Sequence, residues 1–140
     1  MIYYVARFTF REAVTPEQKE EALERLRAHG RIIPSITFSV VGRDFGGEFE
    51  WAAVFGMEDL AGYEEHMRHP EHVVTDRMVL PLVEHGVRFD IADDPDPEVG
   101  ARITEMRRHR LRNDAEAAAL VAAIPSSNAA TDLPSPVRPA

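Results

Sequence analysis

Three of the six histidines of this chain lie close together, at His66, His69 and His72. Histidine titrates near neutral pH and also ligates metals, so such a cluster indicates proton transfer or metal binding. Pro70 stands inside the cluster. A residue before proline is biased away from the α region, whereas proline itself suits the first turn of a helix. We therefore expect one helix to end near His69 and a second to begin at Pro70, with His72 in its first turn.

The expected place of His72 bears on its charge. The first turn of a helix presents free N–H groups and the positive end of the helix dipole, and both disfavour a protonated imidazole. The carboxylate of Glu71 beside it favours the protonated imidazole. His72 is nevertheless a candidate for a neutral general base, while His69 is expected to bond backbone groups at the helix junction.

A metal site is the competing interpretation of the cluster. On an uninterrupted helix the three histidines fall at about 0°, 300° and 240°, so they cannot comfortably chelate one ion. The proline interrupts the helix, which leaves open a two-histidine site completed by Glu71 or Asp76. Thiolate ligands and disulfides are excluded because the chain has no cysteine. We predict that neither a metal nor a cofactor is required.

The pattern of the chain from residue 1 to about residue 92 predicts the elements that position these residues. Residues 2–10 alternate as a strand, and Thr15 with Gln18 forms a capping box for a helix that begins at Pro16 and is expected to end near His29 and Gly30. Strands are expected at 36–43, 48–57 and 86–91, with the histidine-bearing helices before the last strand. Four antiparallel strands with two helical connections predict an α+β, ferredoxin-like βαββαβ fold.

Large and small side chains alternate on the inner face of this predicted sheet. Tyr4, Phe8, Trp51 and Phe55 are the large ones, and Ala6, Ala22 and Ala53 lie among them. Such a set either interdigitates as a core or leaves a cavity. His29 and His85 stand beside glycines near expected helix ends, and we assign both to capping positions at the surface.

The motif His69-Pro70-Glu71-His72 resembles the His-Pro-x-His signature of the stress-responsive α/β-barrel (Dabb) family. The likeness runs in order over roughly residues 1–92, through Ile2-Tyr3-Tyr4-Val5, Thr15-Pro16-Glu17-Gln18, Ile32-Ile33-Pro34, Val41-Gly42-Arg43-Asp44, Leu80-Pro81-Leu82-Val83 and Phe89-Asp90-Ile91. Helices cover only one face of such a sheet, and the other must be buried. The resemblance implies an obligate homodimer, a dimeric α/β barrel whose subunits pack their sheets together. This packing would bury Tyr3, Val5 and Val54.

The resemblance also implies a chemistry. The family includes a plant polyketide cyclase that forms olivetolic acid without a cofactor, and its catalytic base matches His72. The cyclase has a tyrosine where this chain has His66, and a pocket histidine where this chain has Tyr4. Imidazole and phenol differ by several pKa units, so the cyclase mechanism does not carry over unchanged. The residues expected to contact substrate are Tyr63, Ala6, Phe8, Leu26, Trp51 and His69.

These observations predict a cofactor-independent enzyme of the cyclase, lyase or isomerase type acting on a small aromatic or polyketide-like molecule. His72 would remove a proton, and Tyr4, His66 or Tyr63 would hydrogen-bond the developing oxyanion. Two alternatives stay open. One is a non-catalytic, stress-responsive dimer that binds a small molecule, and the other is a cofactor-free oxygenase.

The rest of the chain predicts an appendage to this domain. Residues 93–97 form an acidic, proline-containing linker, 98–124 a helical extension that packs as an arm over a pocket mouth, and 125–140 a flexible tail. The basic run from Arg107 to Arg112 is expected to be a solvated helix face. The net charge of −8 argues against nucleic-acid binding. Neither a signal peptide nor a membrane span is recognisable, so we expect a cytoplasmic location.

Overall fold

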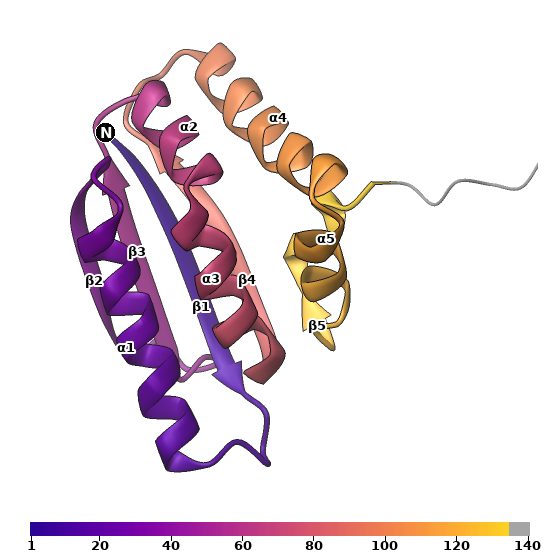
Figure 1. Ribbon diagram of the computed structural model, residues 1–140. Helices are drawn as coiled ribbons and strands as arrows, with labels where there is room; N and C mark the ends of the chain where they lie inside the picture. Colours follow the sequence, from indigo (N-terminus) through magenta and orange to yellow (C-terminus); the bar gives the residue numbers. More distant parts are fainter. Residues whose placement is uncertain (135–140) are drawn as a thin grey trace, which may run out of the picture.

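A single mixed sheet organises the computed structural model, which describes residues 1–134 (Figure 1). Its strand order is β2-β3-β1-β4-β5, and all pairings are antiparallel except that of β4 with β5. The strands are β1 (Ile2–Phe10), β2 (Ile36–Arg43), β3 (Trp51–Met57), β4 (Val83–Ala92) and β5 (Ser126–Ser127). The helices are α1 (Pro16–Ile32), α2 (Leu60–Arg68), α3 (Pro70–Val79), α4 (Pro97–Asn113) and α5 (Ala115–Ala122), with 3-10 turns η1 (Leu80–Leu82) and η2 (Asn128–Asp132). The predicted ferredoxin-like α+β fold is confirmed.

The first helix starts as predicted but ends later. Thr15 and Gln18 form the capping box at its N-terminus. The helix continues through Gly30 because this glycine is a packing residue: a Cβ there would lie 2.5 Å from Oγ of Ser39 on β2. Close approach of helix and sheet, and not chain termination, accounts for the glycine. The third and fourth strands also differ from expectation, since β3 begins at residue 51 and β4 at residue 83.

The junction of α2 and α3 lies at His69, directly before Pro70, as predicted. His69 has extended backbone angles (φ −63°, ψ 136°) and ends one helix while capping the next. Its ring Nδ1 accepts a hydrogen bond of 3.1 Å from the backbone N–H of Glu71, which satisfies one of the free donors of the α3 N-terminus. Pro70 is then the first residue of α3 and His72 the third, with its side chain turned into the molecule.

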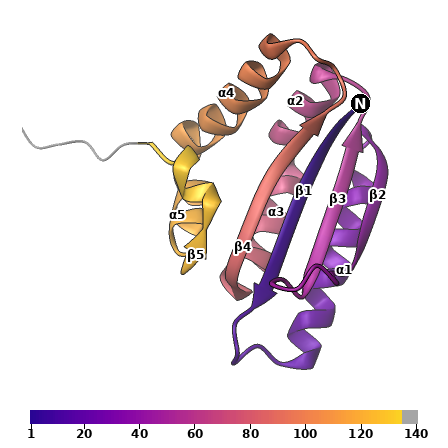
Figure 2. The same ribbon diagram turned by 180° about the vertical axis from the view of Figure 1, so that it is seen from behind.

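The two faces of the sheet differ in their cover. Helices α1, α2 and α3 pack on the face that carries Phe8, Phe55 and Met57, where most of the core lies. Figure 2 shows the opposite face, which none of the helices within residues 1–134 covers. Large apolar side chains are 41% to 51% exposed there, namely Phe38, Val40, Phe89 and Ile91. The predicted open, apolar sheet face is therefore present.

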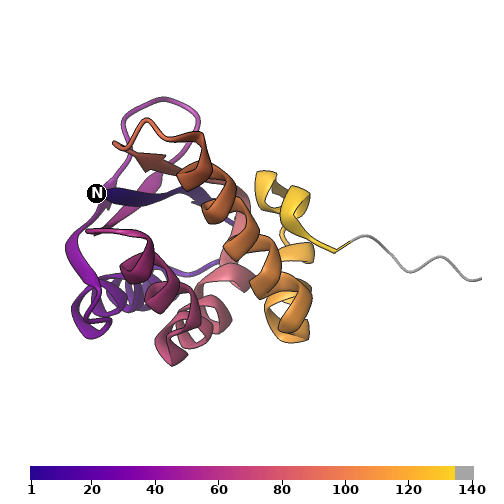
Figure 3. The same cartoon turned by 90° about the horizontal axis from the view of Figure 1, so that it is seen from above.

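The chain after β4 returns to the domain. Helix α4 runs beside α2, and α5 beside α3 (Figures 1 and 3). The prediction of a flexible tail from residue 125 is wrong for residues 126–133, because they form β5 and η2 against β4. The side chain of Asn128 binds both the backbone N–H and the carbonyl of Arg88, at 2.8 Å each. These are polar contacts, which a count of apolar residues does not anticipate. Residues 135–140 of the predicted tail lie outside the described residues.

None of the helices in the described part of the chain is both long enough and apolar enough to cross a membrane.

Candidate functional site

A cavity of about 120 Å³ lies between the helix-covered face of the sheet and the C-terminal extension. The sheet contributes Tyr4, Ala6, Phe8, Phe55 and Arg88, helices α1 and α3 contribute Leu26, His29, His72, Thr75 and Asp76, and the extension contributes Arg107, Arg110, Leu111, Val121, Ala129 and Asp132. The wall is thus largely apolar, with ionisable groups at a few places. This composition is typical of a small-molecule site.

The structure brings five of the predicted site residues to this cavity: Tyr4, Ala6, Phe8, Leu26 and His72. Two others are fully buried beside it. The ring of His66 stacks on that of His72 with centroids 4.7 Å apart, and the hydroxyl of Tyr63 donates to Asp90 at 3.0 Å.

The remaining two predicted residues lie elsewhere. Trp51 is at the start of β3, where the guanidinium of Arg43 covers its ring at 5.1 Å, and it does not line the cavity. His69 caps α3 and faces a separate hollow. Trp51 packs at the edge of the core on the helix-covered face and His69 belongs to the helix junction, so neither lines this cavity.

A buried chain of hydrogen bonds fixes the protons of two histidines. The hydroxyl of Thr75 donates to the carbonyl of Glu71 at 3.0 Å, so it accepts from Nδ1 of His29 at 2.8 Å. Neutral His29 then presents a bare Nε2, which accepts from Nε2 of His66 at 2.8 Å. Nδ1 of His66 is consequently an unprotonated acceptor, and it has no partner among residues 1–134.

The assignment of His29 to a surface cap is therefore wrong. Its side chain is buried because α1 continues beyond it, and the ring points between α3 and the sheet. His85 is not a helix cap either: it lies on β4 and bonds Ser126 and Glu48.

Burial keeps all three inner histidines neutral. Burial first, and then the charge of Arg25, lowers the pKa of His29 to about 4. Burial and His29 lower the pKa of His66 well below its usual value, and burial and Arg110 do the same for His72. The direction of the pKa shift of His72 is the expected one, but its causes are burial and Arg110, whereas the sequence suggested the helix N-terminus.

His72 itself is not held by a hydrogen bond from another described residue. Its Nδ1 is buried without a partner, and the nearest carboxylate oxygen, Oδ1 of Asp76, lies 3.9 Å from Nε2. That distance is too long for a hydrogen bond, but a carboxylate on this side favours the proton on Nε2. The lone pair of Nδ1 is then engaged by no other described residue.

Buried ion pairs join the extension to the domain. Arg107 donates to Asp90 at 2.5 Å and to Asp132 at 3.0 Å, and Arg110 donates to Asp76 at 2.5 Å. The prediction that the basic run is a solvated face is thus wrong for these two arginines. They are one helical turn apart and point inward, whereas Arg108 and Arg112 are exposed.

Sequence reasoning also missed Arg88 and Asp90, because the local pattern indicated that they are exposed to solvent. On β4 the apolar residues Val87, Phe89 and Ile91 alternate with charged ones, a pattern that ordinarily places the charged residues in solvent. The strand register instead places both charged side chains on the helix-covered face, where Asp90 pairs with Tyr4 and Arg88 with Ala6. The guanidinium Cζ of Arg88 lies 4.3 Å over the Tyr4 ring.

Within residues 1–134, no group of three or more histidine, aspartate or glutamate side chains is arranged to hold a metal ion. Of the predicted cluster, His66 and His72 stack ring on ring, Nδ1 of His69 accepts from the backbone of Glu71, and Nε2 of His72 lies 3.9 Å from Oδ1 of Asp76. The geometry gives no support to the two-histidine metal site.

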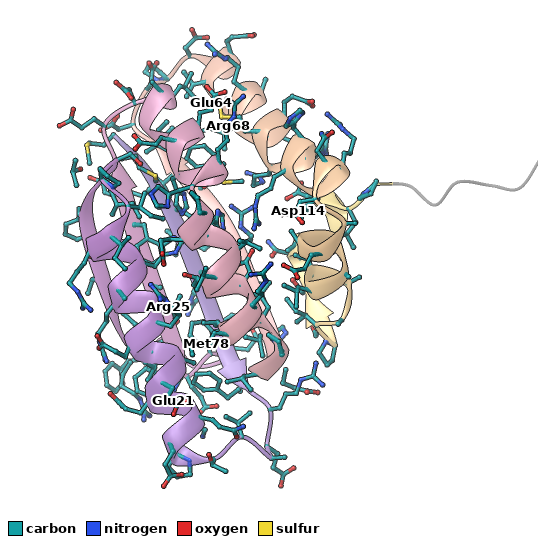
Figure 4. The ribbon with its side chains drawn as sticks, in the orientation of Figure 1. Glu21, Arg25, Glu64, Arg68, Met78 and Asp114 are labelled. Carbon is teal, nitrogen blue, oxygen red and sulfur yellow. The ribbon has the colours of Figure 1, made fainter. Side chains whose placement is uncertain are left out.

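A second hollow, of about 410 Å³, opens between the α2–α3 junction and α4. Figure 4 labels three residues on its rim, Glu64 and Arg68 on α2 and Asp114 at the start of α5. Met67, His72 and Arg110 line both this hollow and the inner cavity. These three side chains therefore lie between the inner cavity and the hollow.

Comparisons with known proteins agree with this architecture. The family model described as "Stress Responsive A/B Barrel Domain" (Dabb) matches residues 2–93, and the chain belongs to this family, as the sequence predicted. No curated protein matches the chain.

Three solved structures illustrate the likeness. A dimeric ferredoxin-like protein of unknown function from Thermobifida fusca is 26% identical, with a TM-score of 0.59, over 65% of this chain and 89% of that one. A hydroxynitrile lyase from Passiflora edulis is 13% identical (TM-score 0.61; 68% and 94% covered). A mutant of a cofactor-independent oxygenase from Streptomyces nogalater is 15% identical (TM-score 0.55; 68% and 94% covered). The last two likenesses concern the fold alone.

Proposed function

We propose that this protein is a cofactor-independent enzyme that moves a proton on a small molecule, with His72 as the general base. The observation that carries the proposal is the neutral imidazole of His72, which lines a largely apolar cavity and whose Nδ1 is bonded to no other described residue. A general base must be neutral, free of a competing donor and within reach of the ligand, and the last condition requires the ligand to uncover Nδ1, which the protein buries. Proton removal is the first step common to cyclisation, lysis and isomerisation.

The partners of the base follow from the hydrogen bonds. The tautomer inferred for His66 gives its only N–H to His29, so it has none to offer a developing oxyanion. Tyr63 donates to Asp90 and is likewise occupied. Tyr4 and Arg88 remain as groups on the cavity wall that can stabilise negative charge. In this proposal His66 orients and supports the His72 ring, on which it stacks.

The cavity limits the size of the substrate. An engineered cavity of roughly 150 Å³ accepts benzene, and the cavity here is about 120 Å³. A molecule of about one ring fits this volume. A polyketide chain would have to extend past Met67 and Arg110 into the neighbouring hollow.

We further propose that the enzyme is a homodimer. The open sheet face carries rows of apolar side chains across four strands, one of them Val40, Val54, Val5 and Phe89. Such a patch favours self-association, and its two-fold use would pair the same face of both copies. The Thermobifida fusca relative is described as dimeric.

Proton abstraction can be tested before the natural substrate is known. The protein is incubated in D₂O with a panel of small molecules that carry an acidic C–H next to a carbonyl, with and without a carboxylate, and NMR follows deuterium entering each carbon. Exchange catalysed by the protein at one or more of these carbons is expected. Ligands that bind while none of them exchanges would contradict the proposal.

One observation favours the second candidate, a binding protein without turnover. Catalytic bases work best when their pKa lies near the working pH, and the pKa of His72 is well below its usual value. In this alternative the cavity would only sequester its ligand. Binding without deuterium exchange is the result that selects it.

A further inference from the structure

Arg88 is a buried cation with unused hydrogen-bond donors. Its Nε and Nη2 have no hydrogen-bond partner among residues 1–134, and its side chain is only 16% exposed. The nearest carboxylate oxygens, from Asp90 and Asp132, are each 3.8 Å from it, which is too long for a hydrogen bond. Both carboxylates give their short contacts to Arg107 instead. A buried donor without an acceptor is destabilising, so an acceptor supplied by a ligand would stabilise this position.

The free edge of Arg88 is the edge that binds a carboxylate side-on. Nε–H and Nη2–H are parallel, and together they match the two oxygens of one carboxylate. Arg7 provides an example in the same protein: its Nε donates to Oδ2 of Asp44 at 2.7 Å and its Nη2 to Oδ1 at 3.0 Å. Arg88 lines the cavity, and the described part of the chain leaves both donors of this pair unoccupied; both are buried atoms, so a carboxylate must displace neighbouring side chains to reach them.

The guanidinium is also held in position. Its Cζ lies 4.3 Å over the ring of Tyr4, and Asn128 bonds both backbone groups of residue 88. Preorganisation of this kind favours binding because little conformational freedom is left to lose.

We propose that Arg88 binds the carboxylate of a small organic acid, whose apolar remainder fills the cavity beside Tyr4 and His72. That this acid is the substrate rests on the function proposed above, whereas the binding itself does not. A planar carboxylate suits the small cavity better than a phosphate, which carries more charge to desolvate. The bound anion would also offset the charge of Arg88, one of the cations that lower the pKa of His72. The imidazole would then become a stronger base when the ligand is present.

The test compares acids with their neutral amides on the wild-type protein. Acetate, isobutyrate and benzoate are each titrated by calorimetry beside acetamide, isobutyramide and benzamide, and phenyl phosphate serves as the phosphate probe. At least one acid is expected to bind roughly 10- to 100-fold more tightly than its amide, the range of a charge-assisted hydrogen bond. Acids that bind no better than their amides, or phenyl phosphate binding as tightly as benzoate, would overturn the proposal.

Substitutions test whether Arg88 is the residue that binds the carboxylate. Arg88→Gln should abolish the preference for acid over amide, and Arg88→Lys, which keeps the charge without the side-on edge, should retain part of it. Arg102→Gln, an exposed arginine on α4, is the matched control and should bind as the wild type does. Unchanged preference in Arg88→Gln, or full preference in Arg88→Lys if the glutamine variant does not fold, would overturn the assignment. His72→Gln should still bind the acid, so a failure of the catalytic proposal leaves this result distinct.

Discussion

The Dabb region and the C-terminal extension contribute different kinds of residue to the same cavity. The Dabb region supplies the neutral histidines, the free guanidinium of Arg88 and the buried acids Asp76 and Asp90. The extension supplies the arginines that bind those acids, and Asp132. The sequence divides the chain into a domain and an appendage. The buried carboxylates of the domain, however, are paired with arginines of the appendage. The C-terminal extension therefore forms part of the cavity wall.

The largest effect should come from separating the two regions. A chain ending at residue 96 leaves Asp76 and Asp90 without Arg110 and Arg107 and exposes the apolar cavity wall. Removing one partner of a buried ion pair costs about 3–5 kcal/mol, and here two pairs are broken. We expect the truncated chain to be unfolded or to melt far below the full chain, as followed by circular dichroism. A chain ending at residue 134 is the control and should melt like the parent; a stable 96-residue chain would show that the extension is dispensable.

A single substitution should reproduce part of this effect. Arg107 binds two buried carboxylates, so Arg107→Gln is expected to lower the free energy of unfolding by about 3–5 kcal/mol in urea denaturation. Arg102→Gln on the same helix is exposed and should change it by less than about 0.5 kcal/mol. Equal effects of the two substitutions would contradict the buried network.

Low pH should destabilise the protein through the buried histidines of the Dabb region. The pKa of His29 is lowered to about 4 in the folded protein, so between pH 6.5 and pH 4 the unfolded chain binds the proton more readily. Stability therefore falls as the pH falls through this window, by up to about 3 kcal/mol for this one group. His29→Gln should show a shallower loss over the same range in urea denaturation. Parallel curves for the variant and the wild type would exclude this origin.

The smallest effect concerns the contact that joins η2 to β4. Asn128→Ala removes two hydrogen bonds to the backbone of Arg88, worth about 1 kcal/mol each. A loss of about 2 kcal/mol in denaturation is expected, together with weaker binding of the acid described above. Thr131→Ala removes one exposed bond within the same turn and should change acid binding little. If Asn128→Ala left both properties unchanged, the segment after residue 125 would not support the site.

The sequence allowed the domain to be predicted better than the site. Periodicity, the capping box at Thr15 and the proline after His69 are local signals, and they placed the helices and strands of the first 92 residues. His72 was also found, because its motif is contiguous. Arg88, Asp90 and His29 were missed because their burial depends on strand register and on a helix that passes through Gly30. The ion pairs of the extension join residues 17 to 34 positions apart, and no local pattern reports such pairs.

The central claim is that His72 removes a proton from a small molecule held in this cavity, and one rate tests it most directly. Deuterium entry from D₂O into a bound C–H acid is measured by NMR for wild type, His72→Gln and the exposed control His109→Gln. The wild type and the control should exchange alike, with a rate that rises with pH below about 6.5 because the pKa of His72 is lowered. His72→Gln should bind the acid but exchange it roughly 10²- to 10⁴-fold more slowly. Equal exchange by wild type and a folded, ligand-binding His72→Gln would contradict the claim.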